Sequence, residues 1–198
     1  MSPAGVAGIV TALLALCHPR VGEAQGGPPL SLEVRGGAAA PVGELAEPAP
    51  GLDAGAGPRL AAVLAWHFTP ALALYGEYSR SWLQCDRCGA RGIEDRVEDA
   101  GFGAGVEFRR DAGLRPWLRA GAILQALVFR DARTALASER APGFRLAVGI
   151  AIPLGPAVAL TPALGYGAYA AALPLGAEGA PAVEVQQFTA DVGISYRF

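Results

Sequence analysis

The sequence predicts an all-β fold, an eight-stranded antiparallel up-and-down transmembrane β-barrel that follows a signal peptide. One reason is that segments in which apolar and polar residues alternate one by one recur along the chain, as in strands with two unlike faces. Another is that the breaks between these segments are alternately long and short. A barrel that places all its short turns on one rim and its long loops on the other has this pattern.

Composition agrees with many short strands rather than long helices. Hydrophobic residues make up 52% of the 198 residues, yet no run after the N-terminus reaches the ~20 apolar residues that a spanning helix needs. The 27 Gly and 16 Pro residues interrupt the apolar content repeatedly. The length suits a single domain, and the formal charge of -2 gives no basic surface that would predict nucleic acid as a partner.

Residues 1–24 are expected to be the signal peptide and residues 25–198 the mature barrel domain. The segment from Gly5 to Cys17 is apolar, and small residues precede the cleavage site expected after Ala24. The first three residues carry no Lys or Arg, which is atypical of a signal. Cys17 leaves lipoprotein processing as an alternative, although Leu16 is bulkier than the small residue that usually precedes a lipidated Cys.

Two cysteines remain in the mature chain, Cys85 and Cys88, with C-x-x-C spacing. Export permits a disulfide between them, and two free thiols are the other simple interpretation. A redox pair would need a thioredoxin-like helix, and a zinc site would need two further ligands. His67 is the one His of the mature chain, so a four-ligand zinc site would need carboxylates as well. We expect neither a metal nor a cofactor.

Eight alternating segments are long enough for the ~9 to 11 residues of a tilted membrane strand. They cover roughly residues 31–39, 58–68, 71–83, 97–110, 115–130, 143–152, 157–170 and 185–198. The breaks after segments two, four and six are tight turns, and the rim that they form is called the short-turn rim. The other breaks form the long-loop rim, and the Ala/Pro/Gly-rich stretch to Gly57 is interpreted as a flexible loop there. A soluble sandwich or lipocalin would share the strand count without sorting its loops by length.

The alternation also predicts which face meets lipid. In the last segment Phe188, Val192 and Ile194 lie opposite Thr189 and Asp191. We assign the polar set to the lumen, whereas a soluble barrel would invert this assignment. Outward aromatic residues are predicted to form two girdles, one near the short-turn rim (Trp66, Phe68, Phe108, Tyr196, Phe198) and one towards the long-loop rim (Tyr78, Trp82, Phe102, Phe144, Tyr166, Phe188).

Five charged residues are expected to meet inside the barrel. Counted from the short-turn rim, Glu77, Arg145 and Asp191 reach similar heights, and Glu107 and Arg119 form a lower pair on adjacent strands. Enclosed charges are costly unless they are paired, so we expect a structural salt-bridge network. An ion path or a catalytic carboxylate pair is the functional alternative, but side chains just fill an eight-stranded barrel.

The C-terminal residues Asp191-Val192-Gly193-Ile194-Ser195-Tyr196-Arg197-Phe198 resemble the β-signal of outer-membrane proteins. That signal has a polar residue, a Gly two places on, and outward hydrophobic residues at the third-last and last positions. These positions are occupied here by Asp191, Gly193, Tyr196 and Phe198. Residues 31–198 look like the small OmpA/OmpX-type barrels and their outer-membrane β-barrel domain family. The resemblance implies a monomer in a bacterial outer membrane, reached through the periplasm with the help of the barrel-assembly machinery, with both termini periplasmic. Outer-membrane lipids and lipopolysaccharide would surround it.

The first functional hypothesis is a structural or surface-binding outer-membrane protein with no catalytic residues, whose external loops meet lipopolysaccharide, host surfaces or other envelope components. A narrow solute pore is the alternative, because Gly101, Gly103 and Gly105 would thin the lumenal wall. A lipid-modifying enzyme is the third. His67 invites comparison with lipid A deacylases, but it lies at the short-turn rim and no Ser is expected beside it.

Deletion of Phe198 is predicted to impair assembly more than stability. Assembly factors would lose the end of the motif, whereas a formed barrel would lose one interfacial ring, worth ~2 to 3 kcal/mol at most if fully buried. Less protein should reach the outer membrane and more should be degraded in the periplasm, as measured by fractionation beside a Phe188→Ala control. An unchanged outer-membrane yield would mean that the motif is ordinary strand patterning.

Overall fold

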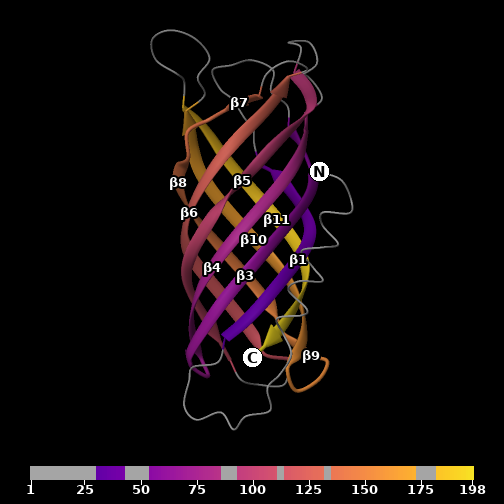
Figure 1. The fold of residues 1–198 in the computed structure, drawn as a ribbon, viewed down its shortest axis with the longest axis vertical. Helices are drawn as coiled ribbons and strands as arrows, with labels where there is room; N and C mark the ends of the chain where they lie inside the picture. Colours follow the sequence, from indigo (N-terminus) through magenta and orange to yellow (C-terminus); the bar gives the residue numbers. More distant parts are fainter. Residues whose placement is uncertain (1–29, 43–53, 86–92, 111–113, 132–134, 173–181) are drawn as a thin grey trace.

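The chain forms a closed barrel of tilted antiparallel strands (Figure 1). The structure, a computed structural model, describes residues 30–42, 54–85, 93–110, 114–131, 135–172 and 182–198. In these ranges the wall consists of eight long strands: β1 (Leu30–Pro41), β3 (Gly57–Thr69), β4 (Leu72–Cys85), β5 (Ile93–Arg109), β6 (Pro116–Asp131), β8 (Ala141–Ile150), β10 (Val158–Ala172) and β11 (Ala182–Arg197). Three short strands are β2 (Ala54–Gly55), β7 (Ala135–Ala137) and β9 (Ile152–Pro153).

Pairing of the first and last long strands closes the sheet. Each long strand is antiparallel to its neighbours, and β11 pairs with both β10 and β1. The β1–β11 ladder runs from Ser31 opposite Arg197 to Pro41 opposite Gln187. The Phe198 N–H continues it by donating to the Leu30 carbonyl at 2.9 Å. The eight-stranded barrel predicted from the alternation is therefore confirmed.

The strand ends differ from the prediction at the long-loop rim. The stretch before Gly57 is not loop throughout, because β2 pairs with β4 at Gln84 and Cys85. The predicted fourth segment starts too late, since β5 begins at Ile93 and its register with β6 shifts between Ile93 and Val97. Both errors arise because pairing continues there while the one-by-one alternation is lost or too short to detect. The expected signal peptide, residues 1–24, lies outside the described residues.

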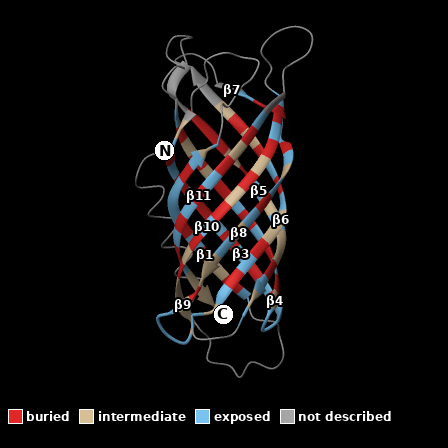
Figure 2. Cartoon of the chain, turned by 180° about the vertical axis from the view of Figure 1, so that it is seen from behind, coloured by how far each residue is buried: buried red, intermediate tan, exposed pale blue. Residues whose placement is uncertain are grey.

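Burial alternates along the strands (Figure 2). The exposed positions carry most of the large apolar side chains. On β3, Leu60 and Leu64 point outward with about half of their surface exposed (54% and 52%). Arg59, on the inward face of the same strand, is only 2% exposed. A soluble barrel has the opposite arrangement. No helix in the described ranges is long and apolar enough to span a membrane. The exterior is therefore the lipid-facing surface that the sequence predicted.

Outward aromatic rings contact one another in two separate groups. Towards the long-loop rim, Tyr78 and Phe102 have ring centroids 5.1 Å apart, and Tyr166 contacts both Phe144 (5.9 Å) and Phe188 (5.2 Å). Near the short-turn rim the contacts are Trp66 with Phe68 at 6.3 Å and Tyr196 with Phe198 at 5.2 Å. Rings that settle at two water interfaces are expected to separate in this way.

Glycines of β5 allow close approach of β6. A Cβ on Gly105 would lie 2.1 Å from the Ala120 carbonyl oxygen, whereas a Cβ on the neighbouring strand's Gly76 would meet nothing within 4 Å. We expect Gly105→Ala to lower the free energy of unfolding by about 1–3 kcal/mol. Gly76→Ala should leave it unchanged or raise it by about 0.5–1 kcal/mol.

Denaturant unfolding of the two variants in the same detergent or lipid measures this difference. Because both changes add one methyl group to adjacent strands, equal effects would show that the close β5–β6 approach carries no stability.

Candidate functional site: the lumenal charge network

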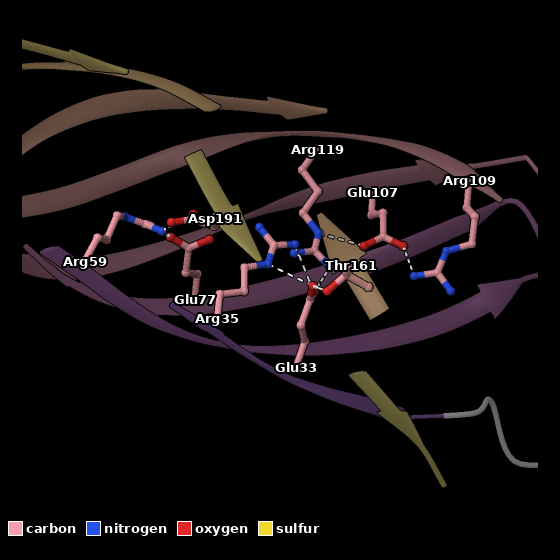
Figure 3. Close-up of polar contacts among 9 residues, drawn as sticks. All are labelled: Glu33, Arg35, Arg59, Glu77, Glu107, Arg109, Arg119, Thr161 and Asp191. Carbon is pink, nitrogen blue, oxygen red and sulfur yellow. Dashed lines mark hydrogen bonds and ion pairs between the residues drawn. The ribbon is translucent and has the colours of Figure 1, made fainter. Parts of the chain in front are cut away.

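A row of arginine and acidic side chains occupies the lumen (Figure 3). Seven of the long strands contribute, through Glu33 and Arg35 (β1), Arg59 (β3), Glu77 (β4), Glu107 and Arg109 (β5), Arg119 (β6), Arg145 (β8) and Asp191 (β11). Each lies on the inward parity of its strand, so the same alternation that exposes leucines to lipid turns these charges inward. All but Arg109 are buried.

One cluster is centred on Arg59 and Glu77. The Arg59 guanidinium donates to Asp191 Oδ2 at 2.5 Å and to Glu77 Oε1 at 2.7 Å, and so joins β3 to β4 and β11. Arg145 donates to the same Glu77 oxygen and to Ser79 Oγ at 3.0 Å. Two cations therefore face two carboxylates, and the formal charge of this cluster is balanced. Such compensation is what makes charge in a narrow lumen tolerable.

A second cluster lies nearer the short-turn rim. Glu33 accepts bidentately from Arg35 at 2.8 and 2.9 Å, from Arg119 at 2.7 Å and from the Thr161 hydroxyl. Arg119 also donates to Glu107 at 2.6 Å, and Arg109 lies 2.7 Å from the other Glu107 oxygen. Three cations thus face two carboxylates. This second cluster carries a formal surplus of one positive charge.

Aromatic rings fill the space around these guanidinium groups. Arg35 and Arg119 lie over the Trp117 ring, with the guanidinium carbons 4.7 and 4.6 Å from its centroid, and Arg119 also lies 5.4 Å from the Tyr75 centroid. Trp117 in turn packs against Ala151 and Ala163. A cation over an aromatic face is attracted by the ring quadrupole, so the rings hold the guanidinium groups as well as excluding water.

Towards the long-loop rim the lumen loses its arginines and then becomes apolar. Asp99 accepts hydrogen bonds from Tyr169 Oη at 3.0 Å and Gln187 Nε2 at 2.8 Å, and all three residues are buried. Beyond this layer lie inward apolar side chains that are almost completely buried: Leu83, Val97, Leu127, Ala171 and Val185. In the described part of the chain, side chains therefore occupy the lumen at every level.

The structure brings together Glu77 with Arg145 and Glu107 with Arg119. Arg59 joins Asp191 to Glu77, but not to the pair of Glu107 and Arg119. Sequence reasoning missed Arg59, Glu33 and Arg35. Their signal was available, because Glu33 and Arg35 alternate with apolar residues on the first predicted strand and Arg59 does so on the second. Gly193, Tyr196 and Phe198 of the terminal motif lie at the β11 end, where residues 193 and 196 pair with β1.

His67 has a serine beside it, which corrects the sequence-based expectation. Ser31 Oγ lies 2.9 Å from His67 Nε2, because β1 and β3 are neighbours and Ser31 pairs with Ala65. Serine and histidine at this distance are the geometry of an activated nucleophile. Both are buried, however, and Ser31 borders a cavity of only about 30 Å³, too small for an acyl chain.

The remaining sequence-based sites lie at or beyond the edge of the described residues. Cys88 falls outside them, and for Cys85 the backbone alone is described, at the end of β4 opposite Ala54. The disulfide therefore remains a prediction. Among the described residues no group of three or more His, Cys, Asp or Glu side chains is arranged to hold a metal ion.

The chain is similar to known proteins in its structure. No protein-family model and no curated protein sequence matches the chain. Neisserial surface protein A (NspA) is similar at 14% identity, over 85% of this chain and 97% of that chain, with a TM-score of 0.65. The attachment invasion locus protein Ail of Yersinia pestis is similar at 14% identity, over 87% and 100% of the two chains (TM-score 0.54).

The outer membrane protein OprG of Pseudomonas aeruginosa is similar at 13% identity, over 89% of this chain and 99% of that chain, with a TM-score of 0.53. At such low identities the similarity concerns the fold. The fold is that of the small eight-stranded outer-membrane barrels, as the terminal motif and the alternation predicted, and a barrel of this type resides in the bacterial outer membrane.

Removal of Arg59 should destabilise the barrel strongly. Arg59→Met would leave Glu77 and Asp191 without the cation they share, and breaking a buried pair from one side typically costs about 3–5 kcal/mol. Arg80→Met is the matched control, because Arg80 pairs with Glu98 on the outer wall with 28% of its side chain exposed. A loss of at most about 1 kcal/mol is expected there. Denaturant midpoints compare the variants, and similar losses would contradict the bridging role of Arg59.

Proposed function

We propose that the protein is a monomeric outer-membrane barrel of the structural or surface-binding type, which acts through its external loops and outer wall rather than through its lumen. The observation that carries the proposal is the occupied lumen. From Glu33 and Arg119, through Arg59 and Glu77, to Leu127, paired charges and then apolar side chains fill the interior. A barrel of this size has room for side chains but no spare channel.

The glycine row that favoured a pore has a different role in this structure. A Cβ on Gly101 would lie 2.1 Å from the Leu124 carbonyl oxygen, and one on Gly103 would lie 3.1 Å from Ile123 Cγ2. These glycines therefore admit β6 and its side chains at close range instead of opening a passage. The specific argument for a solute pore is lost with them.

Contact with outer-membrane lipids and lipopolysaccharide is supported by basic groups beside the aromatic girdle towards the long-loop rim. On the outward face, the Arg80 guanidinium lies 5.1 Å from the Trp82 ring centroid, and that of Arg140 lies 5.5 Å from the Phe102 centroid. Cations at the headgroup level attract anionic groups, and aromatic rings settle there. A related precedent for surface binding is Ail, solved in complex with the heparin analogue sucrose octasulfate (15% identity, TM-score 0.54).

No catalytic role is included in the proposal. The Ser31–His67 pair is the strongest enzymatic arrangement among the described residues, and the small cavity beside it argues against lipid hydrolysis. Mass spectrometry of lipid A from cells with and without expression of the protein distinguishes a non-catalytic barrel from a lipid-modifying enzyme. A changed lipid A would support the enzyme.

Two measurements test the proposed function. The mature chain should be recovered in the outer-membrane fraction with heat-modifiable migration on gels, and recovery in the soluble periplasmic fraction would contradict the proposal. In planar bilayers we expect no stable unitary conductance, because the charge clusters block the lumen. Stable conductance that changes on Glu77→Ala or Arg145→Ala would overturn the filled lumen and favour the pore.

A further inference from the structure

The outer wall of the barrel is hollowed where β8, β10, β11 and β1 follow one another around the sheet. Two hollows, of about 490 and 630 Å³, share Val148, Leu164 and Ala190 in their linings, so they adjoin and together form the outer-wall groove. Gly36 and Ala38 of β1 also line it. All five positions are exposed on the outward side of their strands. The groove arises because residues with little or no side chain lie beside the larger Val148 and Leu164.

The two ends of the outer-wall groove differ in the side chains that bound them. Towards the long-loop rim it is lined by the rings of Tyr166 and Phe188, whose centroids are 5.2 Å apart. Towards the short-turn rim its lining is apolar and includes Ile150, Pro162 and Val192. A molecule that lies along the groove therefore has its apolar part in the hydrocarbon band and one end at an aromatic girdle. This shape suits an amphiphile.

A second copy of the chain fits the outer-wall groove less well than a lipid does. A symmetric contact centred on the groove would set one hollow against another and leave voids between the two walls. Association in a membrane depends on close van der Waals packing, which such voids forfeit. A flexible hydrocarbon chain can instead follow the groove and fill it.

Polar groups continue the outward face beyond the two rings. Tyr166 Oη donates to Gln186 Oε1 at 2.8 Å, and Gln186 Nε2 donates to Glu184 Oε1 at 2.7 Å. Glu184 is exposed, near the start of β11 at the long-loop rim. The groove therefore leads from apolar side chains to a carboxylate at the level where lipid headgroups lie.

On this side of the barrel the sequence provides acidic residues and no outward cation. The chain contains no lysine, and no arginine occurs in residues 36–58 or 146–196. Arg35 on β1 and Arg145 on β8 point into the lumen, and the Arg140 guanidinium lies 5.5 Å from the Phe102 centroid on β5. The segments that join these strands add further acids in their sequences: Glu44, Glu47, Asp53 and Glu178. Negative charge at this rim attracts an ammonium group and repels an anion.

From the groove, its polar end and its charge we infer a binding site for one ethanolamine phospholipid. One acyl chain lies in the groove against Val148, Leu164 and Ala190, and the headgroup ammonium donates to the Glu184 carboxylate. An ethanolamine ammonium has N–H groups to donate, whereas a quaternary choline group has none. The site depends on the membrane location of the wall. It is independent of the proposed role of the loops, so a conducting lumen would leave it unaffected.

Native mass spectrometry of the mature barrel, released from nanodiscs, tests the site. The nanodiscs contain equimolar phosphatidylethanolamine, phosphatidylcholine and phosphatidylglycerol with identical acyl chains. We expect one retained lipid per barrel, with phosphatidylethanolamine preferred. Ala190→Phe fills the groove and should lower retention about ten-fold, because the acyl chain loses apolar contact. Ala38→Phe replaces it if Ala190→Phe loses heat-modifiable migration. Ala122→Phe is the matched control, since Ala122 is an exposed alanine of β6 outside the lining, and it should leave retention unchanged.

Glu184→Gln tests the headgroup contact separately. The variant should still retain one lipid, but its preference for phosphatidylethanolamine over phosphatidylglycerol should fall by about two- to five-fold, as expected for an exposed ion pair. Glu139→Gln is the control, because Glu139 is exposed at the same rim and does not line the groove. Several results would overturn the site: no retained lipid, preferred retention of phosphatidylglycerol, displacement by equimolar lipopolysaccharide, equal losses in Ala190→Phe and Ala122→Phe, or a barrel dimer that Ala190→Phe dissociates.

Discussion

Pairing of every backbone N–H and C=O group is the constraint on which the rest of this structure depends. In hydrocarbon an unpaired group costs several kcal/mol, so the first and last strands must join. They do so along the ladder from Ser31–Arg197 to Pro41–Gln187. Closure with eight long strands then fixes a narrow lumen, and a narrow lumen leaves little space for water to solvate the side chains that face inward. The packing of the interior therefore follows from the need to pair β1 with β11.

Ion pairing resolves the consequence of placing charges in that interior. The Arg59 guanidinium lies between carboxylates of β4 and β11, so it satisfies two acids at once and links strands that are not neighbours. Asp191 has a double role, because it occupies the polar place of the terminal motif and also contacts Arg59. The residue identity at this position is therefore constrained by the lumen as well as by any recognition of the motif during assembly.

The sequence sufficed for the fold and for the direction of most side chains, but not for the partners of the lumenal charges. Alternation fixes parity within a strand, so it turned Glu77, Arg145 and Glu107 inward. Which charges meet across the lumen depends on strand tilt and register between strands, which no local pattern encodes. Arg59 and Asp191 are 132 positions apart, and Ser31 reaches His67 only through the β1–β3 register.

The two ends of the lumen differ in chemistry, and this bears on where function resides. Among the described residues, the interior at the long-loop rim ends in the apolar side chains of Leu83, Leu127 and Val185. At the short-turn rim it ends in arginines that border a small cavity. The two ends of the lumen therefore present different side chains, apolar groups at one rim and guanidinium groups at the other. In the described residues, apolar side chains fill the lumen above the charge clusters and separate them from the long-loop rim.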